Sequence, residues 1–545
     1  MIKLLIDKNL DDNFDKIHYC LNFIFESIGC HATIIKTMDE INKKDIVICY
    51  TKKLLGQKEK FQLIEMSDSK NILFISAYIP LYNSIMLNKK SLMKLKKEYH
   101  SIYVLSEKIP SVKKQKSDYT STINYNFDII GNIYFHLSQS ENKILLAKNK
   151  FEDKNLLFFN ELKEFPFLNK LIKLFELDII SSLPKDCFFV KKHLWPKGED
   201  YAMCISATVN KLYKFKNSFK ELFKIFFMFF VSPAKAIKQY FNYLFSKYEE
   251  YWNFYLFKNL LITYFFGLGD DKNLDYSIKD EEIVKIIEEL SLSDNHDISI
   301  FLDKKSDYIL DKRDIKNSEK NKLNIGGMGL RTEKLGTGSF FEDFLYCQGR
   351  GFQKNNGFKS GIALPYFNYS LNKSRKQILM IPDIFNTQNL RKSTFSSQSY
   401  SKVLKSFETI VANIKKTNGI VCFNFNFSDL YEIGYSKKLL TKCVEQNKKD
   451  NIFFNTIKGL TSWWLQRDEL NVRELYDAVE IISPKFVKNV CFEIFGNYRI
   501  KKITGCRGSI TENKVVLSNV KRYAKIVIHL KKQIKSEIKK NTIVA

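Results

Sequence analysis

Short apolar runs alternate with a segment of helical periodicity over residues 1–110, which predicts a small α/β domain. Ile2 to Ile6, Asp45 to Tyr50 and Asn71 to Ile75 are compact runs of the kind that form buried strands. Between the first two runs, Asp15 to Ile28 carries apolar residues three and four positions apart, as expected of a helix packed on a sheet. No glycine-rich phosphate loop follows these strands, so nothing in this domain indicates nucleotide binding.

Residues 111–190 are expected to connect this domain to the next one. They open with a polar stretch over residues 111–122, which predicts an exposed loop. The following segment, Phe127 to Gln139, has a helical pattern that places His136 on one face. A single histidine on such a face is more often packed in a core than used chemically, so we expect a structural role for His136.

Strand and helix signals alternate again over residues 191–468, which predicts a second α/β domain. A family resemblance, given below with the residues that carry it, implies that this domain is a distorted (β/α) barrel. Its opening unit has a buried strand from Tyr201 to Ile205 and a polar strand end from Ser206 to Asn210. The carboxyl ends of the strands in such a barrel carry its chemistry, because they point into the open mouth. The polar end of this strand is therefore the first candidate for a functional site.

The last part of the chain contains several short strands separated by Gly, Pro and Asn turns, roughly 10 residues apart, which predicts a small antiparallel sheet. This region is either an appendage packed on the barrel, which we favour, or an accessory that binds glycans. The sequence as a whole thus predicts an α/β fold in four parts. These are an N-terminal α/β domain (1–110), a connecting segment (111–190), the expected (β/α) barrel (191–468) and a β-rich C-terminal region (469–545).

The most apolar run, Ile225 to Val231, is too short to cross a bilayer, which takes about 20 residues. We expect it to be buried in the wall of the barrel; the alternative is an amphipathic helix that lies on a membrane surface. The N-terminus has no long apolar segment followed by a small-residue cleavage site. We therefore expect a cytoplasmic protein, with peripheral membrane contact left open.

The chain carries a net charge of +27, which favours polyanions such as nucleic acid, anionic glycans or lipid head groups. The lysines are scattered, however, and no nucleic-acid-binding module is recognisable. We therefore interpret the charge as compositional and expect no nucleic acid partner. The ten cysteines form no C-x-x-C pair and no zinc-type spacing, which is typical of buried thiols in a reducing compartment.

Several stretches from Phe127 onward carry a family resemblance through their order as well as their residues. They are Phe127 to Gln139, Trp195 to Lys214, Tyr251 to Leu268, His296 to Leu302, Glu342 to Phe358, Gly361 to Tyr366, Ile378 to Pro382, Gly419 to Phe425 and Thr461 to Arg467. In this order they resemble the polysaccharide deacetylase (NodB-homology) family, in particular a long bacterial subgroup with an extra N-terminal region. That subgroup ends its opening barrel strand in T-H-D-V-D or a close variant, where this chain reads Ser206-Ala207-Thr208-Val209-Asn210.

The resemblance implies a set of catalytic positions. In the family, one Asp and two His bind a divalent metal that activates a water; a second Asp acts as base, a late His as acid, and an Arg orients the base. By resemblance, the base falls on Thr208, the metal-binding Asp on Asn210, the first metal-binding His on Phe301, the orienting Arg on Lys359 and the late His on Asn426. Lys359 keeps a positive charge without the planar fork of arginine, and the other four side chains are neutral.

The resemblance therefore implies a protein of carbohydrate metabolism, in particular of surface glycans, whose catalytic positions are no longer intact. We favour a catalytically inactive protein that binds a carbohydrate or anionic glycan, or acts as a scaffold, with Arg331, Lys359 and Tyr366 as candidate substrate-binding residues. No metal and no other cofactor is expected. A divalent metal such as zinc belongs only to the first alternative, an active carbohydrate deacetylase or hydrolase with an atypical site. The second alternative is a basic protein that binds nucleic acid or a membrane surface.

Overall fold

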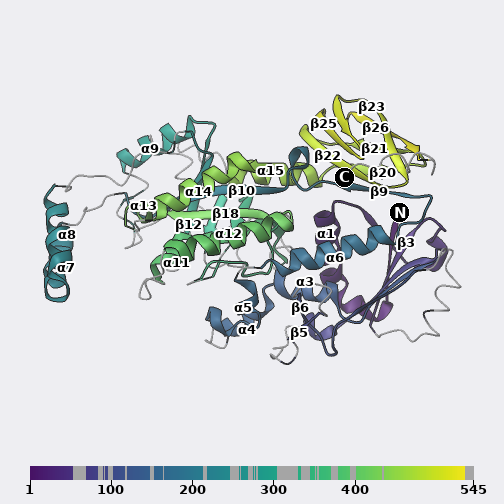
Figure 1. Cartoon of the computed structure of the whole chain (residues 1–545), viewed down its shortest axis with the longest axis horizontal. Helices are drawn as coiled ribbons and strands as arrows, with labels where there is room; N and C mark the ends of the chain where they lie inside the picture. The colour runs from purple at the N-terminus through teal and green to yellow at the C-terminus, as the bar shows by residue number, and fades with distance from the viewer. Residues whose placement is uncertain are drawn as a thin grey trace.

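Three sheet-based regions make up the chain in this computed structural model (Figure 1). The region built on the middle part of the chain occupies the centre, and the N-terminal sheet and the C-terminal strands lie together at one end of it. The structure describes residues 1–52, 60, 69–83, 90, 92–95, 102–116, 120–147, 152–163, 165–212, 218–245, 257, 259–267, 274, 276–277, 280–302, 329–332, 344–349, 351–352, 355–369, 378–392, 400–432 and 435–533.

The N-terminal region is a six-stranded sheet that is parallel except for one edge strand. Its main helices are α1 (Phe14–Ile28), α3 (Ile129–Leu137) and α6 (Phe167–Ser181). Shorter elements are β5 (Leu92–Lys94), β6 (Tyr103–Leu105), α4 (Ser140–Ala147) and α5 (Phe159–Leu162). The strands in spatial order are β2 (Ala32–Ile35), β1 (Ile2–Ile6), β3 (Ile46–Thr51), β4 (Asn71–Ser76), β8 (Ser121–Tyr125) and β7 (Val112–Lys116).

This sheet continues past residue 110, into the segment that the sequence predicted to be connecting. The prediction of an exposed loop over residues 111–122 is wrong where the structure describes them, because Val112–Lys116 forms β7 and pairs with β8. β7 is an edge strand, and its four residues after Val112 are exposed. Charged side chains are common on edge strands because they discourage pairing with other chains, so this strand lacks the apolar alternation that reveals most strands.

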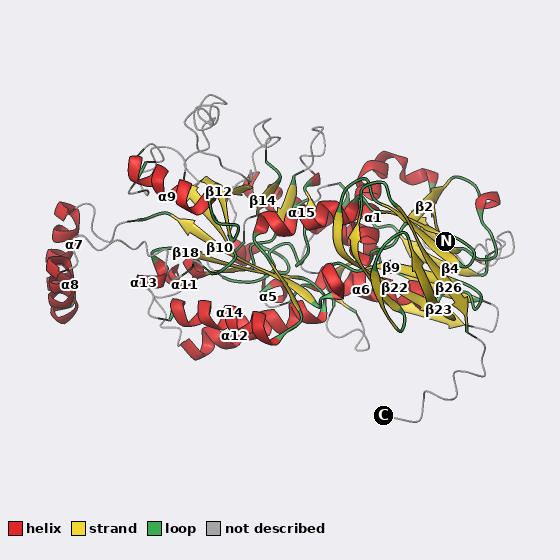
Figure 2. Ribbon diagram, turned by 90° about the horizontal axis from the view of Figure 1, so that it is seen from above, coloured by secondary structure: helices red, strands yellow, loops and turns green. Residues whose placement is uncertain are grey.

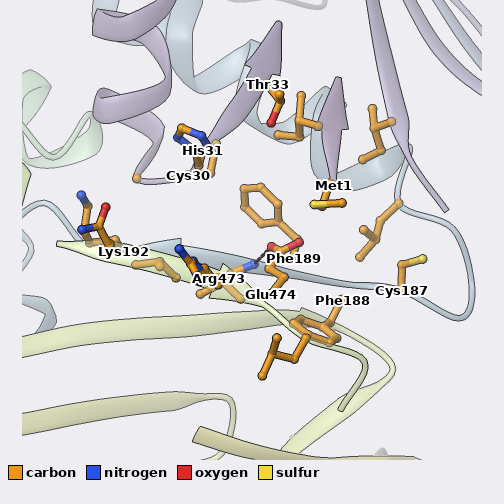
Figure 3. Close-up of a pocket in the computed structure, with 18 of the residues that line it drawn as sticks. Met1, Cys30, His31, Thr33, Cys187, Phe188, Phe189, Lys192, Arg473 and Glu474 are labelled. Atoms are coloured by element: carbon orange, nitrogen blue, oxygen red, sulfur yellow. Dashed lines mark hydrogen bonds between the residues drawn. The ribbon is translucent and has the colours of Figure 1, made fainter. Parts of the chain in front are cut away.

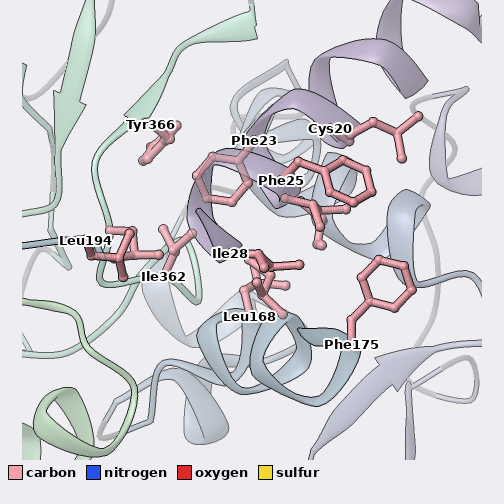
Figure 4. Close-up of a cluster of buried hydrophobic side chains, with 14 of the residues drawn as sticks. Cys20, Phe23, Phe25, Ile28, Leu168, Phe175, Leu194, Ile362 and Tyr366 are labelled. Carbon is pink, nitrogen blue, oxygen red and sulfur yellow. The ribbon is translucent and has the colours of Figure 1, made fainter. Parts of the chain in front are cut away.

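One hydrophobic core joins α1 and α6 to the middle of the chain (Figure 4). Phe23 and Phe25 of α1 lie in it with Leu168 of α6 and with Tyr366, which belongs to the next sheet. His136 on α3 is buried in the same region, with its ring 4.7 Å from that of Phe158 and 4.8 Å from that of Phe167 (centroid distances). The structural role that the sequence predicted for this histidine is confirmed.

The middle region is a 10-stranded sheet whose strands are parallel except for the short β15. Although β16 and β17 stand near opposite ends of the strand order, only residues 382–384 separate them in sequence. The prediction of a mixed α/β fold with parallel sheets is confirmed. The order is β15 (Tyr366–Phe367), β16 (Leu379–Ile381), β14 (Tyr346–Gln348), β13 (Gly329–Thr332), β12 (His296–Leu302), β11 (Ile262–Gly267), β10 (Tyr201–Val209), β18 (Ile420–Asn426) and β17 (Phe385–Asn386), with β19 (Ile452–Phe454) beside β10.

Alternate residues of this sheet face two different environments. Met203 and Phe423, at odd-numbered positions of β10 and β18, belong to an apolar cluster with α12 (Tyr400–Lys416) and α14 (Ser436–Lys449). Apart from Ile420 at the start of β18, even-numbered positions on the same strands carry small or polar side chains, which a strand can direct only to the opposite face. The remaining helices of the region are α9 (Glu281–Ser291), α11 (Thr387–Lys392), α13 (Asp429–Glu432) and α15 (Ile457–Asp468).

The C-terminal region consists of two four-stranded antiparallel sheets. An antiparallel C-terminal sheet was predicted, but one of its strands, β9 (Phe188–Lys192), spans the predicted boundary between the connecting segment and the barrel and pairs with β22. The first sheet has the order β20 (Asn471–Glu474), β21 (Ala478–Ile482), β26 (Lys525–Lys532) and β23 (Tyr498–Thr504), and the second β24 (Gly508–Thr511), β25 (Lys514–Val520), β22 (Val487–Gly496) and β9.

A helical hairpin, formed by α7 (Ser218–Val231) and α8 (Pro233–Phe245), projects from the middle region at the far end from the N-terminal sheet (Figure 2). The sequence predicted that Ile225 to Val231 would be buried in the wall of the middle sheet. This is wrong, because Phe226, Phe227 and Phe230 are all exposed to solvent. Among the described residues, no helix combines the length and apolar character needed to cross a bilayer.

Candidate functional site

The carboxyl ends of β10 and β18 bring two of the sequence-predicted site residues side by side. Parallel pairing places Thr208 opposite Asn426, and both side chains are buried. The hydroxyl of Thr208 lies 3.4 Å from the amide oxygen of Asn424, and the amide nitrogen of Asn424 donates to Ser206 Oγ over 2.8 Å. The even-numbered face of these strands is therefore filled by neutral groups that hydrogen-bond to one another.

The neighbouring strands β11, β12 and β13 carry further residues near their carboxyl ends, at about the height of Thr208 on β10. Phe301 on β12 pairs with Gly267 on β11 and with Arg331 on β13. Asn210 directly follows β10, and its side-chain oxygen is buried without a hydrogen-bond partner among the described residues. The structure thus places Thr208, Asn210, Phe301, Arg331 and Asn426 at the carboxyl ends of strands of one sheet.

The polar face continues across the sheet to β14. Ser206 Oγ on β10 donates to the side-chain oxygen of Gln348 on β14 over 3.2 Å, and the amide nitrogen of Gln348 lies 3.4 Å from Cys422 Sγ on β18. Three strands stand between β10 and β14 in the order of the sheet. Since neighbouring strands are about 4.8 Å apart, this contact requires the sheet to curl until β14 faces β10.

Arg331 forms a buried ion pair with Asp383, at 2.9 Å between Nη2 and Oδ2. Asp383 lies between β16 and β17, and Asn386 donates to the same carboxylate. Arg331 Nη1 is buried without a hydrogen-bond partner among the described residues. The guanidinium therefore fastens the segment between β16 and β17 to β13.

Two other candidate residues lie elsewhere. Tyr366 is buried on β15 in the core beside α1, as Figure 4 shows. Lys359 is half-buried, two residues before Gly361, which packs against Phe167 of α6. Two residues further on, Ala363 contacts Gly419 at the amino end of β18, opposite to the end that carries Asn426. The structure thus does not group Tyr366 with the strand-end residues.

A buried carboxyl group on the polar face was missed in the sequence. Asp297 on β12 accepts hydrogen bonds from Tyr346 on β14, at 2.8 Å, and from Thr263 on β11, at 3.3 Å. Burial raises the pKa of Asp297 to about 6. Because His296 and Asp297 begin β12, this group lies at the amino end of the strand, away from Phe301. Its hydrogen bonds to two other strands, β11 and β14, indicate a structural role.

The larger of two cavities that we consider, about 1020 Å³, lies between α1, the segment around β15 and α15. We call it the α1 cavity. Tyr19 donates from its hydroxyl to the carbonyl oxygen of Phe367, and the Tyr369 ring lies 5.2 Å from that of Tyr19 and 5.3 Å from that of Tyr134. The cavity therefore has a wall of linked aromatic side chains. Its other lining residues include Asp15, His18, Asn22, Phe23, Glu26, His31, Tyr366, Trp464 and Asp468.

Two of the carboxyl groups at this cavity form a hydrogen-bonded pair. Burial and the nearby charge of Glu26 raise the pKa of Asp468 to about 7. Burial acts in the same direction on Glu26, but the charges of Lys192 and Arg467 outweigh it, and the pKa of Glu26 is lowered. Near neutral pH, the pair therefore holds one ionised group, Glu26, and one group that exchanges its proton, Asp468.

A second cavity of about 480 Å³ adjoins the first and shares Glu26, Cys30 and His31 with it. Figure 3 shows Met1 and His31 on one side of this amino-terminal cavity and Lys192, Arg473 and Glu474 on the other. Its lining combines cationic and acidic groups. The described lining of the α1 cavity, in contrast, includes Asp15, Glu26 and Asp468 and no lysine or arginine.

Comparisons with known proteins place no constraint on these sites: no family model matches the chain, and neither a curated protein nor a solved structure shows significant similarity to it. Within the described part of the chain, no group of three or more His, Cys, Asp and Glu side chains is arranged to hold a metal ion.

The sequence contains one signal for the α1 cavity. Trp464 and Asp468 are four positions apart on α15, so they share a helix face. Their partner Glu26 lies on α1, at the other end of the sequence. An aromatic and an acidic residue at this spacing are too common to predict a site alone.

Proposed function

We propose that this chain is a carbohydrate-binding protein built on a deacetylase-like barrel, without the metal-dependent deacetylation of the family that its sequence resembles. The observation that carries the proposal is the register that puts Thr208 opposite Asn426 at the carboxyl ends of β10 and β18. Those are the positions of the base and the acid by resemblance. A threonine hydroxyl and an asparagine amide cannot exchange protons near neutral pH, so the barrel mouth lacks acid–base groups there.

Two features support a barrel. The contact between Ser206 and Gln348 crosses the interior of the curled sheet. In addition, β16 pairs with β14 and β17 pairs with β18, so the single chain segment Leu379–Asn386 bridges both sides of the strand order. Side chains that would lie inside a barrel are thus in contact. The segment Leu379–Asn386 spans the gap between β16 and β17, which stand near the two ends of the strand order.

The metal requirement is the first test. We expect the purified protein to hold far less than one equivalent of zinc, cobalt or nickel, and to release no acetate from acetylated oligosaccharides with or without added metal. The double substitution Asn210→Asp with Phe301→His should not restore activity, because the base and acid positions remain vacant. Metal analysis together with an acetate assay measures both. One equivalent of metal and acetate release that a chelator abolishes would establish an active enzyme instead.

The α1 cavity is the part of the molecule best suited to a sugar. Aromatic rings such as Tyr19, Tyr134 and Tyr369 offer flat apolar faces, and carboxyl groups such as Glu26 accept hydrogen bonds from hydroxyl groups. The described lining offers no lysine or arginine to an anionic glycan. A protonated amine would be attracted by the carboxylate of Asp15 and by the aromatic faces. We therefore propose neutral or amine-bearing oligosaccharides as the ligands.

Substitutions in the cavity test this ligand class. We expect Tyr369→Ala to weaken binding of a glucosamine oligosaccharide about tenfold, or about 1.4 kcal/mol, because the sugar loses a stacking surface. Asp15→Asn should weaken the glucosamine oligosaccharide more than its N-acetylated counterpart, since only the former carries a positive charge. Titration calorimetry gives both affinities. Tyr523→Ala, at an exposed tyrosine of the C-terminal sheets, is the matched control. Equal affinities for all the variants would rule out this cavity as the sugar site.

A further inference from the structure

The hairpin of α7 and α8 is a compact unit in which one residue, Ser232, joins the two helices. Its backbone nitrogen donates to the carbonyl of Met228 over 2.7 Å, and Ala236 donates back to the carbonyl of Ser232 over 3.0 Å. Ile225 and Ala236 are buried at this hairpin. Both views show the pair of helices standing away from the sheets (Figures 1 and 2).

The outer surface of the hairpin is strongly apolar. Exposure is greatest at the turn, where Phe230 is 76% and Val231 86% accessible to solvent. Large hydrophobic side chains are rarely gathered on a protein surface in this way, and such a patch marks a surface that meets another phase or partner. The exposed residues are Leu222, Phe223, Phe226, Phe227, Phe229, Phe230, Val231, Ile237, Tyr240 and Phe241.

The distribution of these side chains around α7 distinguishes a membrane from a protein partner. At about 100° per residue, the exposed apolar positions from Leu222 to Val231 cover an arc of about 200°. A partner helix, or a second copy of this hairpin, covers one stripe and leaves the rest of such an arc in water. A bilayer interface can contact the whole arc and the tip together, because lipid flows around an inserted element.

The charge and length of the hairpin agree with a location at the interface between membrane and water. Residues 218–245 contain four lysines and one glutamate, and Lys235 near the turn is exposed. Phe and Tyr side chains favour the zone between head groups and acyl chains, and lysines favour anionic head groups. The 14 residues of α7 span about 21 Å, too short to cross the hydrocarbon core of about 30 Å.

We propose that the α7–α8 hairpin anchors this protein to an anionic bilayer, with the turn around Phe230 and Val231 inserted below the head groups. The aromatic face of α7 lies in the interface, and the exposed Lys235 contacts phosphate groups. The sheet regions stay outside the bilayer. This attachment does not depend on the proposed carbohydrate function, because the hairpin lies far from the α1 cavity.

Vesicle co-sedimentation of the full chain tests the anchor. We expect the wild-type protein to bind vesicles of phosphatidylcholine and phosphatidylglycerol at 3:1, and to bind pure phosphatidylcholine at least tenfold more weakly. The double substitution Phe226→Ser with Phe230→Ser should reduce binding to the anionic vesicles at least tenfold. Both side chains are exposed, so this variant should keep the wild-type circular dichroism and melting temperature. Leu292→Ser and Tyr476→Ser, at exposed apolar sites outside the hairpin, are the controls and should bind like wild type.

Three outcomes would overturn the proposal. The first is a wild-type protein that does not sediment with anionic vesicles. The second is a hairpin variant that binds as well as wild type, because attachment would then arise from the overall positive charge. The third is a wild-type dimer that the hairpin variant converts to a monomer without any loss of vesicle binding, since the apolar face would then belong to an interface between two copies.

Discussion

Replacing Arg467 with methionine is expected to destabilise the protein by about 3–5 kcal/mol, since it breaks a buried ion pair and leaves its partner groups unsatisfied. The side chain of Arg467 is fully buried. Its Nε donates to the carbonyl of His193 over 2.8 Å, and Nη2 donates to the carbonyls of Glu26, over 2.8 Å, and Lys192, over 3.2 Å. Nη1 lies 3.3 Å from the carboxylate of Glu26. One guanidinium thus fastens α15 to α1 and to β9.

Urea unfolding followed by circular dichroism measures this effect as a lower midpoint at an unchanged slope. Arg467→Lys should recover only part of the loss, because an ammonium group cannot bond three carbonyls and a carboxylate from one planar fork. Arg499→Met, at an exposed arginine of β23, is the matched control and should change stability by less than about 0.5 kcal/mol. A loss below about 1 kcal/mol for Arg467→Met would show that the three segments are held by other contacts.

Asp468→Asn is expected to stabilise the protein at pH 8, by about 1–3 kcal/mol, and to have a smaller effect at pH 5. The pKa of Asp468 is raised to about 7 in the folded protein, by burial and by Glu26. A group with a raised pKa binds its proton more tightly when folded. The stability it contributes is fully present below the unfolded pKa of about 3.9 and is lost as the pH rises through about 7. Asparagine stays neutral and avoids this loss.

The free energy of unfolding, measured for both proteins between pH 5 and pH 8, should therefore diverge as the pH rises. The wild-type curve should fall relative to that of Asp468→Asn from pH 5 to about pH 7 and level off above that pH. Asp294→Asn, at an exposed position between α9 and β12, is the control and should give a curve parallel to wild type. If the two curves for Asp468 also run parallel, the carboxyl pair does not share a proton in the folded protein.

Local pattern was sufficient to predict the buried strands. The structure has β1 at Ile2–Ile6 and β4 at Asn71–Ser76, where the apolar runs Ile2 to Ile6 and Asn71 to Ile75 predicted buried strands. Strands of a parallel sheet are covered on both faces, so each appears as a short continuous apolar run. β7 was missed for the opposite reason: as an edge strand it has only one paired side, and its lysines are exposed.

The apolar run of α7 shows a different limit of structure prediction from sequence. Its composition predicted burial, because most apolar residues in a globular protein contribute to a core. Whether a neighbouring element covers a helix is decided by tertiary structure, which periodicity does not contain. Here α7 packs on α8 alone among the described elements near it, and its phenylalanines remain exposed.

The meeting of the strand-end residues could be predicted from the sequence, whereas that of the residues at the α1 cavity could not. Thr208 and Asn426 could be expected to meet, because the carboxyl ends of parallel strands lie at one edge of a sheet. Glu26 and Arg467 are 441 positions apart, and neither belongs to a recognisable motif. Only the packing of α1 against α15 brings such residues to one cavity.

The position of β9 has a consequence for biosynthesis. Phe188–Lys192 is fully buried, yet its pairing partner is Phe492–Gly496, near the end of the chain. During translation, this strand leaves the ribosome long before β22 is made, so its edge toward β22 and its two phenylalanines stay uncovered by that strand throughout synthesis of the middle region. An unpaired apolar strand is prone to associate with other chains. The nascent protein should therefore depend on a holding chaperone until its last strands emerge.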